Sequence, residues 1–354
     1  MIGRKIIAWY GINKRDLPWR DTSNPYLIWV SEIILQQTRV NQGLDYYYRF
    51  TNAYPDIFSL AEANPDDVLK IWQGLGYYSR ARNMLVAAKQ LRDTFHGKFP
   101  ETYDRLITIK GIGDYTAAAI ASFAFGQAVP VIDGNVNRVI ARLYGVQQPI
   151  NRPSGQRLIR SYAEKLMVRE SPGEYNQAVM EFGALQCVPH SPDCAGCILH
   201  RDCFARKNNL ADILPVKEKT LKITTRYFHY LNIIYCDKTY IKRRPDGDIW
   251  TGLYEFPLIE TKEEMSVDEL YLLTEWKSLL EGRSPHIRSV APEVTHRLTH
   301  RILKIRFYEI MIDEPLFQGG FMEIPRSDID RYAVPKVIEN YLKISRPASA
   351  CDTE

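Results

Sequence analysis

The feature that most constrains this chain is a pair of glycines placed between two segments of helical composition. A helix-like segment ends at Lys110, Gly111-Ile112-Gly113 follows, and the next segment is rich in Ala and Ile. Neither glycine carries a Cβ, so the backbone can turn tightly and approach a partner closely. Such a turn leaves the N–H groups of the second helix pointing outward, which suits an anion such as a phosphate. An ordinary helix–helix turn is the alternative interpretation.

Two carboxyl groups stand out on either side of this turn. Asp133 lies in the run Val-Ile-Asp-Gly-Asn-Val at 131–136. Glu32 lies in a segment that Asn24-Pro25 opens as a helix start and that we expect to stay helical through Thr38. The neighbours of Glu32 at three and four residues' spacing are mostly apolar, so its carboxyl lies beside apolar groups. A carboxylate at the rim of a helix face is the commoner fate of such a residue. The functional alternative is a partly desolvated carboxyl with a raised pKa, able to act as a general acid.

Four of the six cysteines, Cys187, Cys194, Cys197 and Cys203, fall within seventeen residues, with the spacing C-x6-C-x2-C-x5-C. No export signal precedes them, so the clustering favours a metal site over disulfides. Zinc sites usually come as two close pairs, which this spacing is not. Cys236 and Cys351 are isolated.

Length and charge set wider bounds. The 354 residues suffice for two or three domains. No apolar run approaches the ~20 residues of a membrane span, and the N-terminal segment lacks the apolar core of a signal peptide, so we expect a cytoplasmic protein, nucleoid-associated in a bacterium. The net charge is +4, and the excess of Lys and Arg lies in the first 215 residues. This modest excess is compatible with a polyanionic partner there.

The periodicity of the chain changes once. Helical patterns dominate residues 1–205, with two helices expected over 44–72, and residues 206–222 look like a linker. Beyond it, Arg226–Tyr235 and Lys304–Ile312 are rich in β-branched and aromatic residues, which predicts a mixed α/β domain over 223–345. We expect the tail, residues 346–354, to be disordered.

These motifs together resemble a known family. Ile109–Gly113 with Asp133 at this distance resembles the helix-hairpin-helix DNA glycosylases. The run 131–136, the Leu-Gln-Gln-Thr after Ile34, the Gln-Gly-Leu-Gly-Tyr-Tyr-Ser-Arg-Ala-Arg-Asn at 73–83 and the cysteine spacing resemble, more narrowly, the adenine DNA glycosylases of the MutY type. The likeness is dense up to residue 203 and sparse after 257.

The resemblance implies a multidomain architecture. It consists of an all-α helix-hairpin-helix glycosylase core and a C-terminal α/β Nudix-like domain. The core has a six-helix lobe at about 25–130 and a second lobe, formed by the N-terminal helix and residues 131–205, with an iron–sulfur cluster loop. Residues 248–257 resemble the Nudix-like domain, but no acidic metal-binding helix is visible after Glu255. We therefore expect a lesion-recognition module without hydrolysis of its own.

The resemblance also implies a reaction. The family hydrolyses the N-glycosidic bond of adenine mispaired with 8-oxoguanine or guanine, after the base leaves the helix stack. Glu32 would protonate adenine at N7, and Asp133 would stabilise the positive sugar or bond to it transiently. Tyr115 and Asn135 would orient these two groups. Strand-nicking members carry a lysine at the position of Tyr115, and a phenol forms no Schiff base, so a monofunctional enzyme that leaves an abasic site is implied.

Further residues are implied to bind the cofactor and DNA. The four clustered cysteines would hold a [4Fe–4S] cluster. The substrate would be double-stranded DNA, bound by a monomer, with Arg80 and Arg82 at phosphates. The remaining implied contacts are Trp19, Arg20 and Gln177 at the base pocket, Gln37 and Tyr77 inside the duplex, and Gly111 and Gly113 at a phosphate.

A C-terminal motif of the family recognises the oxidised base through Phe-Ser-His. Here Leu298-Thr299-His300 is the aligned stretch, and it keeps a hydroxyl and an imidazole while Leu replaces the aromatic wedge. A second Thr-His, at Thr295-His296, leaves an alternative register open. An ordinary strand or turn is the simpler interpretation of both.

Two rival functions differ in class. A bifunctional pyrimidine-lesion enzyme like endonuclease III shares the fold and the cluster, but Tyr115, the Glu32 motif and the long C-terminal domain oppose it. A non-catalytic DNA-binding or redox-sensing iron–sulfur protein is opposed by the retention of both carboxyl groups.

Overall fold

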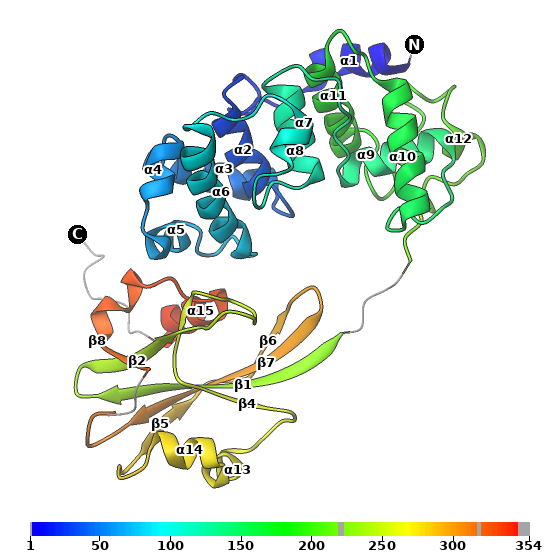
Figure 1. Cartoon of the computed structure of the whole chain (residues 1–354). Coiled ribbons are helices and arrows are strands. Elements are labelled where there is room, and N and C mark those ends of the chain that lie inside the picture. Colours follow the sequence, from blue (N-terminus) through cyan, green and yellow to red (C-terminus); the bar gives the residue numbers. More distant parts are fainter. Residues whose placement is uncertain (1, 219–222, 317–319, 346–354) are drawn as a thin grey trace, which may run out of the picture. The chain divides into compact units, whose positions relative to one another are not determined.

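The computed structural model describes residues 2–218, 223–316 and 320–345 (Figure 1). The chain divides into two compact units: Met1–Ala63 with Asn83–Lys219, and Asn64–Arg82 with Thr220–Glu354. The tail that we expected to be disordered lies outside the described residues. No helix in the described part of the chain is long and apolar enough to cross a membrane.

The first unit is built from helices. They are α1 (Ile2–Asn13), α2 (Pro25–Ile34), α3 (Val40–Ala53), α4 (Ile57–Glu62), the greater part of α6 (Ser79–Phe95), α7 (Tyr103–Leu106), α8 (Asp114–Phe123), α9 (Gly134–Tyr144), α10 (Pro153–Leu166), α11 (Pro172–Leu185) and α12 (Phe204–Lys207). Helix α8 packs against α2 and α11, and α11 also packs against α1 and α9. This arrangement brings segments far apart in sequence around α8.

Local sequence explains the ends of several helices. Asn24 caps α2 by accepting a hydrogen bond from Tyr26 N, and Pro25 occupies the first turn. Helix α9 ends at Tyr144 and is capped by Gly145, whose φ of 71° is the left-handed conformation that glycine adopts without a Cβ penalty.

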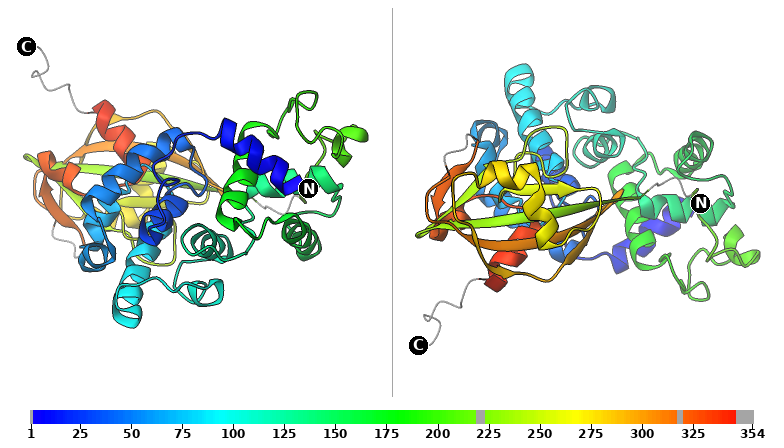
Figure 2. Two further views of the ribbon diagram at one scale, coloured as in Figure 1. Left: turned by 90° about the horizontal axis from the view of Figure 1, so that it is seen from above. Right: turned by 90° about the horizontal axis from the view of Figure 1, so that it is seen from below.

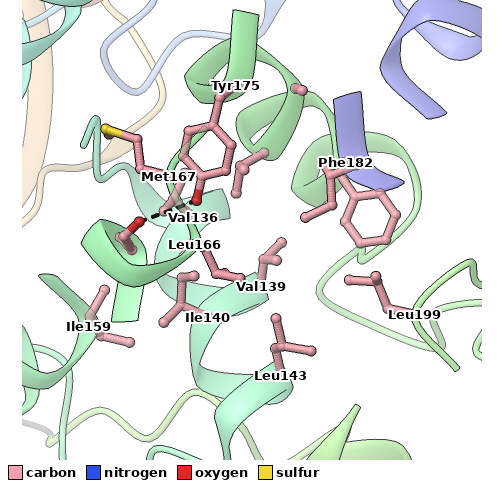
Figure 3. Close-up of a cluster of buried hydrophobic side chains, with 14 of the residues drawn as sticks. Val136, Val139, Ile140, Leu143, Ile159, Leu166, Met167, Tyr175, Phe182 and Leu199 are labelled. Carbon is pink, nitrogen blue, oxygen red and sulfur yellow. Dashed lines mark hydrogen bonds between the residues drawn. The ribbon is translucent and has the colours of Figure 1, made fainter. Parts of the chain in front are cut away.

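A core of buried side chains joins α9, α10 and α11 (Figure 3). Every third or fourth residue of α9 turns inward, as an amphipathic helix requires. Figure 3 shows these side chains meeting others from α10 and α11, and Leu199 from the segment that carries the cysteines. The labelled members are Val136, Val139, Ile140, Leu143, Ile159, Leu166, Met167, Tyr175, Phe182 and Leu199.

Three expectations about helix limits are wrong. Helix α2 ends at Ile34 rather than Thr38, and Gln37 has a φ of 58°. The helix before the glycine turn, α7, ends at Leu106 rather than Lys110. Three helices, not two, occupy the segment 40–71, because a capping box at Asp56 and Ser59 starts α4 and Asn64 with Pro65 starts α5 (Pro65–Ile71).

The second unit contains an eight-stranded sheet. Its strands are β1 (Thr224–Tyr235), β2 (Lys238–Arg243), β3 (Tyr254–Glu255), β4 (Leu258–Thr261), β5 (His286–Val290), β6 (Val294–Arg297), β7 (Arg301–Met311) and β8 (Met322–Pro325). The path runs β3-β2-β1-β7-β5; β4 pairs with β1, β6 with β7 and β8 with β2. Strands β1 and β7 pair in parallel and the other pairs are antiparallel. Both segments predicted as strands are therefore confirmed.

Helices cover both faces of this sheet. Alternate residues of β1 serve two cores, Phe228 and Tyr230 on one face and Leu231 and Ile233 on the other. The first core includes η1 (Arg326–Arg331) and α15 (Lys336–Ser345), and the second includes α13 (Val267–Leu272) and α14 (Thr274–Leu279). The view from below in Figure 2 shows α13 and α14, in yellow, across the strands.

The segment 64–82, including α5, belongs to the same unit as the sheet. Asp66 accepts a hydrogen bond from the Tyr254 hydroxyl at 2.8 Å, and Lys70 Nζ donates to the Tyr332 carbonyl at 3.1 Å. Arg82 Nη1 donates to the Thr251 carbonyl at 2.6 Å. These side-chain contacts explain why a short stretch from the helical half of the sequence groups with the C-terminal residues.

Candidate active site

Glu32 lies on α2 with its side chain buried. The Tyr115 hydroxyl, from α8, donates a hydrogen bond to Glu32 Oε2. Burial raises the pKa of Glu32 to about 7, the negative charge of Asp133 adds to the rise, and the Tyr115 hydrogen bond and the Arg20 charge oppose it. A carboxyl with this pKa can hold a proton near neutral pH and release it to a substrate.

Asp133 caps the N-terminus of α9. Its Oδ1 accepts a hydrogen bond from Val136 N at 2.7 Å, and its Oδ2 accepts one from Asn135 Nδ2 at 2.8 Å. Burial raises the pKa of Asp133, while both hydrogen bonds favour the charged form and oppose the rise. The two carboxyl groups thus have different partners, one a phenol and the other amide donors at a helix N-terminus.

A second layer holds Asn135. Arg138 Nη2 donates to Asn135 Oδ1 at 2.8 Å, and Arg138 Nε donates to the Cys187 carbonyl at 2.7 Å. The same guanidinium donates to the Gly183 carbonyl at 2.6 Å. Arg138 therefore orients Asn135, and the carbonyls of Gly183 on α11 and of Cys187 hold Arg138 in place. This support for Asn135 was not predicted from the sequence.

The raised pKa of Glu32 predicts a pH-dependent stability. Ionising Glu32 costs more in the folded chain than in the unfolded chain, where its pKa is 4.5. Protonation therefore stabilises the fold fully below about pH 4.5, and this contribution is lost as the pH rises through about 7. We expect Glu32→Gln to remove this loss, worth about 3 kcal/mol between pH 4.5 and 8. Urea unfolding of both proteins across this pH range measures the unfolding free energy. If the free energies of wild type and variant change with pH in parallel, the prediction is wrong.

The two glycines of the turn before α8 have different surroundings. Gly111 has a φ of +80°, and a Cβ there would lie 2.6 Å from Asn83 Cβ. Gly113 is the N-cap of α8 with a φ of −88°, and a Cβ there would meet open space. Gly111 thus shapes the turn, while Gly113 leaves the exposed N–H groups at the start of α8 open to a partner.

This difference makes the two positions a matched pair. Gly111→Ala places a side chain in the left-handed region and against Asn83, so we expect a loss of about 2 kcal/mol or more of unfolding free energy. Gly113→Ala creates neither conflict, and because alanine is a poorer N-cap than glycine we expect it to cost about 1 kcal/mol or less. Urea denaturation of both variants tests this, and equal losses would contradict the assignment.

Three predicted base-pocket residues lie in the first unit. Trp19 is buried with its ring edge against Tyr47 at 5.1 Å between centroids. Gln177, on α11, accepts a hydrogen bond from the Tyr10 hydroxyl at 2.8 Å. Arg20 lies over the Tyr10 ring and pairs with Glu181, also on α11. Glu181 was not predicted as a site residue; its one signal in the sequence is an acidic residue within a mostly apolar helical run.

The two residues predicted to enter the duplex share a strained backbone. Gln37 has a φ of 58° and Tyr77 a φ of 47°. Gln37 lies in the turn after α2, Tyr77 lies just after the turn that follows α5, and Tyr77 is 49% exposed. Positive φ at non-glycine residues is uncommon and clusters at functional positions. Gln37 belongs to the first unit and Tyr77 to the second.

In the second unit, Leu298, Thr299 and His300 form the turn between β6 and β7. Thr299 and His300 are exposed, whereas Leu298 packs in part against the core of the sheet. The Tyr77 hydroxyl and Thr299 Oγ1 are 3.1 Å apart and share a hydrogen bond. The alternative pair, Thr295 and His296, lies within β6 in register with β7. Residues 298–300 therefore lie in a turn, whereas residues 295 and 296 lie within a paired strand.

The two arginines that we expected to contact phosphates make contacts within the protein instead. Arg80 is buried, with its guanidinium over the rings of Trp72 and Tyr77. Arg82 donates to the Thr251 carbonyl. The structure does not present these two side chains as phosphate contacts. Arg80 packs on aromatic rings and Arg82 bonds to a backbone carbonyl, and both contacts fix the segment around Tyr77.

The four clustered cysteines line one pocket of the first unit, together with residues of α9. Arg142, on α9, donates to Cys187 Sγ at 3.4 Å, and Leu199 N donates to Cys197 Sγ at 3.4 Å. Burial raises the pKa of Cys187, and raises that of Cys197 to about 11. Within the described residues, no three His, Cys, Asp or Glu side chains are arranged to hold a single metal ion. Thiolates are the donors that hold iron–sulfur clusters, so the four cysteines that line this pocket are of the donor type that such a cluster uses.

Comparison with known proteins agrees with this geometry. The family of HhH-GPD superfamily base excision DNA repair proteins matches residues 30–165, and the NUDIX domain family matches residues 229–343. Among solved structures, a thermostable thymine-DNA glycosylase superposes with a TM-score of 0.55 at 26% identity, over 58% of this chain and 95% of that one. An endonuclease III–DNA complex superposes at 0.51 and 20% identity, over 59% and 95%, which shows the fold alone.

Curated relatives extend over both units. The adenine DNA glycosylase of Buchnera aphidicola subsp. Schizaphis graminum is 33% identical over 298 residues, which cover 84% of this chain and 85% of that protein. The human adenine DNA glycosylase is 38% identical over 57% of this chain and 39% of that protein. Since the Buchnera protein matches along most of both chains, this chain belongs to the adenine DNA glycosylases within the HhH-GPD superfamily of base excision DNA repair proteins.

Proposed function

We propose that this enzyme is a monofunctional glycosylase that removes adenine opposite 8-oxoguanine or guanine in double-stranded DNA and leaves an abasic site. The observation that carries the proposal is the buried Glu32 carboxyl, hydrogen-bonded to Tyr115 and within the electrostatic influence of Asp133. Hydrolysis of an N-glycosidic bond needs one proton donor and one fixed negative charge, and this pair supplies both.

In the proposed mechanism, Glu32 gives its proton to N7 of the extruded adenine. Adenine is a poor leaving group as an anion, and protonation lets it depart neutral. As the C1′–N9 bond breaks, positive charge gathers on the sugar, and the Asp133 carboxylate stabilises it or bonds to C1′ transiently. Glu32, now ionised, accepts a proton from the attacking water. Tyr115 and Asn135 hold the two carboxyl groups in their roles.

Monofunctionality rests on Tyr115. A glycosylase that also cuts the backbone needs an amine to form a Schiff base with the sugar. The residue that contacts Glu32 here is a phenol, and burial raises its pKa well above 10. Tyr115 therefore stays a neutral hydrogen-bond donor to Glu32.

Recognition of the opposite base is assigned to the second unit. Thr299 and His300 present a hydroxyl and an imidazole on the exposed turn between β6 and β7, beside Tyr77. These groups can hydrogen-bond to the edge of 8-oxoguanine while Tyr77 and Gln37 enter the duplex. We infer that the enzyme works as a monomer on chromosomal DNA in the cytoplasm of a bacterium.

We further infer that Cys187, Cys194, Cys197 and Cys203 hold a [4Fe–4S] cluster. Support comes from the pocket they share and from the N–H groups that donate to Cys187 and Cys197 sulfur atoms, as expected around thiolate ligands. These four residues would hold the cluster, which would cross-link the stretch 187–203 and so stabilise the fold. Arg142 anchors the same loop through the carbonyls of Val188 and Pro189.

Cluster binding yields a separate prediction. Purified wild-type protein is expected to contain four iron and four sulfide per chain, and Cys197→Ser to contain less of both and to unfold at lower temperature. Elemental analysis, visible absorption and thermal unfolding measure this. Cys236→Ser is the matched control, because Cys236 is exposed and lies in the other unit. Zinc in place of iron would contradict the assignment.

One assay tests the reaction. Duplexes carrying adenine opposite 8-oxoguanine, adenine opposite guanine, or an oxidised pyrimidine are incubated with the enzyme, with and without alkali. We expect free adenine from the first two and strand breaks only after alkali. Breaks without alkali would identify a strand-nicking enzyme, and binding without turnover would identify a non-catalytic protein; either result overturns the proposal.

A further inference from the structure

Residues 15–20, in the loop that precedes α2, are attached at both ends to one buried carboxylate. Glu181 Oε1 accepts hydrogen bonds from Arg15 N at 2.9 Å, Arg15 Nε at 2.8 Å and Arg20 Nη1 at 3.0 Å. Its Oε2 accepts from Arg15 Nη2 and Arg20 Nη2, both at 2.6 Å. The Glu181 side chain is only 1% exposed. A single carboxylate thus holds the two arginines that begin and end residues 15–20.

This attachment is stronger than an ordinary ion pair. Both arginines meet Glu181 through two side-chain nitrogen atoms, which fixes their direction as well as their distance. Burial raises the pKa of Glu181, but hydrogen bonds from Arg15 and Arg20 outweigh burial and lower it to about 2. Glu181 therefore stays charged across the working pH range, and its two partners stay in place.

Arg20 connects this group to the catalytic residues. Its guanidinium lies 5.5 Å from the centre of the Tyr10 ring, and Tyr10 donates to Gln177, one of the predicted base-pocket residues. Arg20 Nη1 also donates to the Arg15 carbonyl at 2.8 Å. The positive charge of Arg20 acts on Glu32 and lowers its pKa, against the effects of burial and Asp133. Arg20 therefore influences the proposed acid from a position that Glu181 sets.

We propose that Glu181 is a positioning residue for adenine excision, which holds the Arg20 guanidinium over Tyr10, the residue that bonds to Gln177 of the proposed base pocket. This inference rests on the proposed function. Glu181 acts on the reaction only through Arg20, with Arg15 holding the other end of the same loop. The charged and titratable groups that face Glu32 are Tyr115 from α8, Asp133 before α9 and Arg20 from this loop.

The test variant is Glu181→Gln, which keeps the shape of the side chain and removes its charge. The positive charge of Arg20 lowers the pKa of Glu32, so release of Arg20 should let that pKa rise. In the pH–rate profile of single-turnover adenine release, the alkaline limb is then expected to move to higher pH. The rate on the low-pH plateau is expected to fall about tenfold or more, because the base is held less well. Glu181→Asp should restore part of both. A limb that stays in place or moves to lower pH would overturn the inference.

Glu255→Gln is the matched control. Glu255 is 2% exposed and pairs with Arg244, so its loss also removes a buried ion pair, but in the other unit. Both variants are expected to lose stability in urea, and only Glu181→Gln should move the pH limb. If Glu181→Gln does not fold, Arg20→Lys replaces it, because one ammonium cannot keep both bonds to Glu181. It should move the limb in the same direction, and an unmoved limb overturns the inference.

A crystal structure of Glu181→Gln separates this inference from the proposed function. A displaced Arg20 guanidinium supports the positioning role, and an unmoved guanidinium overturns it, whatever the activity. Absence of adenine release from the wild-type enzyme would instead remove the proposed function.

Discussion

Replacing Glu32 with glutamine is expected to slow adenine release by at least about 10³-fold at neutral pH, with affinity for the substrate duplex unchanged. The amide keeps the shape of the side chain and an oxygen for Tyr115, but it has no proton to give to adenine N7. General acid catalysis by a placed carboxyl contributes about 10² to 10⁴ in rate, and the same residue also serves as the base toward water. Single-turnover kinetics with a duplex carrying adenine opposite 8-oxoguanine measure the effect.

Glu62→Gln is the control for this substitution. Glu62 is an exposed residue at the end of α4 in the same unit, so the same chemical change there should leave the rate within twofold. The assignment fails if Glu32→Gln retains wild-type kinetics while remaining folded. It also fails if the wild-type rate does not decline as the pH rises through about 7, the value to which burial raises the pKa of Glu32.

Asp133→Asn is expected to have a comparably large effect on rate and a small one on stability. Removing the fixed negative charge leaves the positive sugar unstabilised, which should cost about 10³-fold. The asparagine oxygen still accepts from Val136 N, so the cap of α9 survives. The change also places an amide donor opposite the Asn135 amide donor, and Arg138, which donates to Asn135 Oδ1, keeps Asn135 from flipping, so this one hydrogen bond is lost at a cost of about 1 kcal/mol.

Asp133→Ala distinguishes the two roles of this residue. It loses the charge and the cap together, so we expect the same loss of rate and an additional loss of about 1 kcal/mol in unfolding free energy. Thermal unfolding and single-turnover kinetics on both variants separate these effects. An asparagine variant with near wild-type rate would show that the negative charge is not needed.

Local signals were enough to place several elements. Asn24-Pro25 marks the start of α2 because the cap and the first-turn proline act within four residues. The strands β1 and β7 were recognisable from β-branched and aromatic residues. The helix-hairpin-helix core and the Nudix-like domain are confirmed, because each depends on a pattern contained in a continuous stretch of sequence.

Other features depend on segments that meet only in the folded chain. The sequence around α2 continues to favour helix beyond Ile34, but Gln36 Nε2 donates to Thr116 Oγ1 on α8 at 3.3 Å in the turn that replaces it. Glu181 meets Arg15 and Arg20 across more than 160 positions. Tyr77 meets Thr299 across 222 positions. No local pattern encodes such pairings.

The sequence alone determined which chemical groups are present: two carboxyl groups, a tyrosine in place of an amine, and four clustered thiols. The tertiary structure decided how these groups behave. Burial under helices from distant segments raises the pKa of Glu32, whereas donors at the start of α9 favour the charged form of Asp133. The physical reason is that desolvation and hydrogen bonding depend on every segment packed around a group, while residue identity and spacing do not.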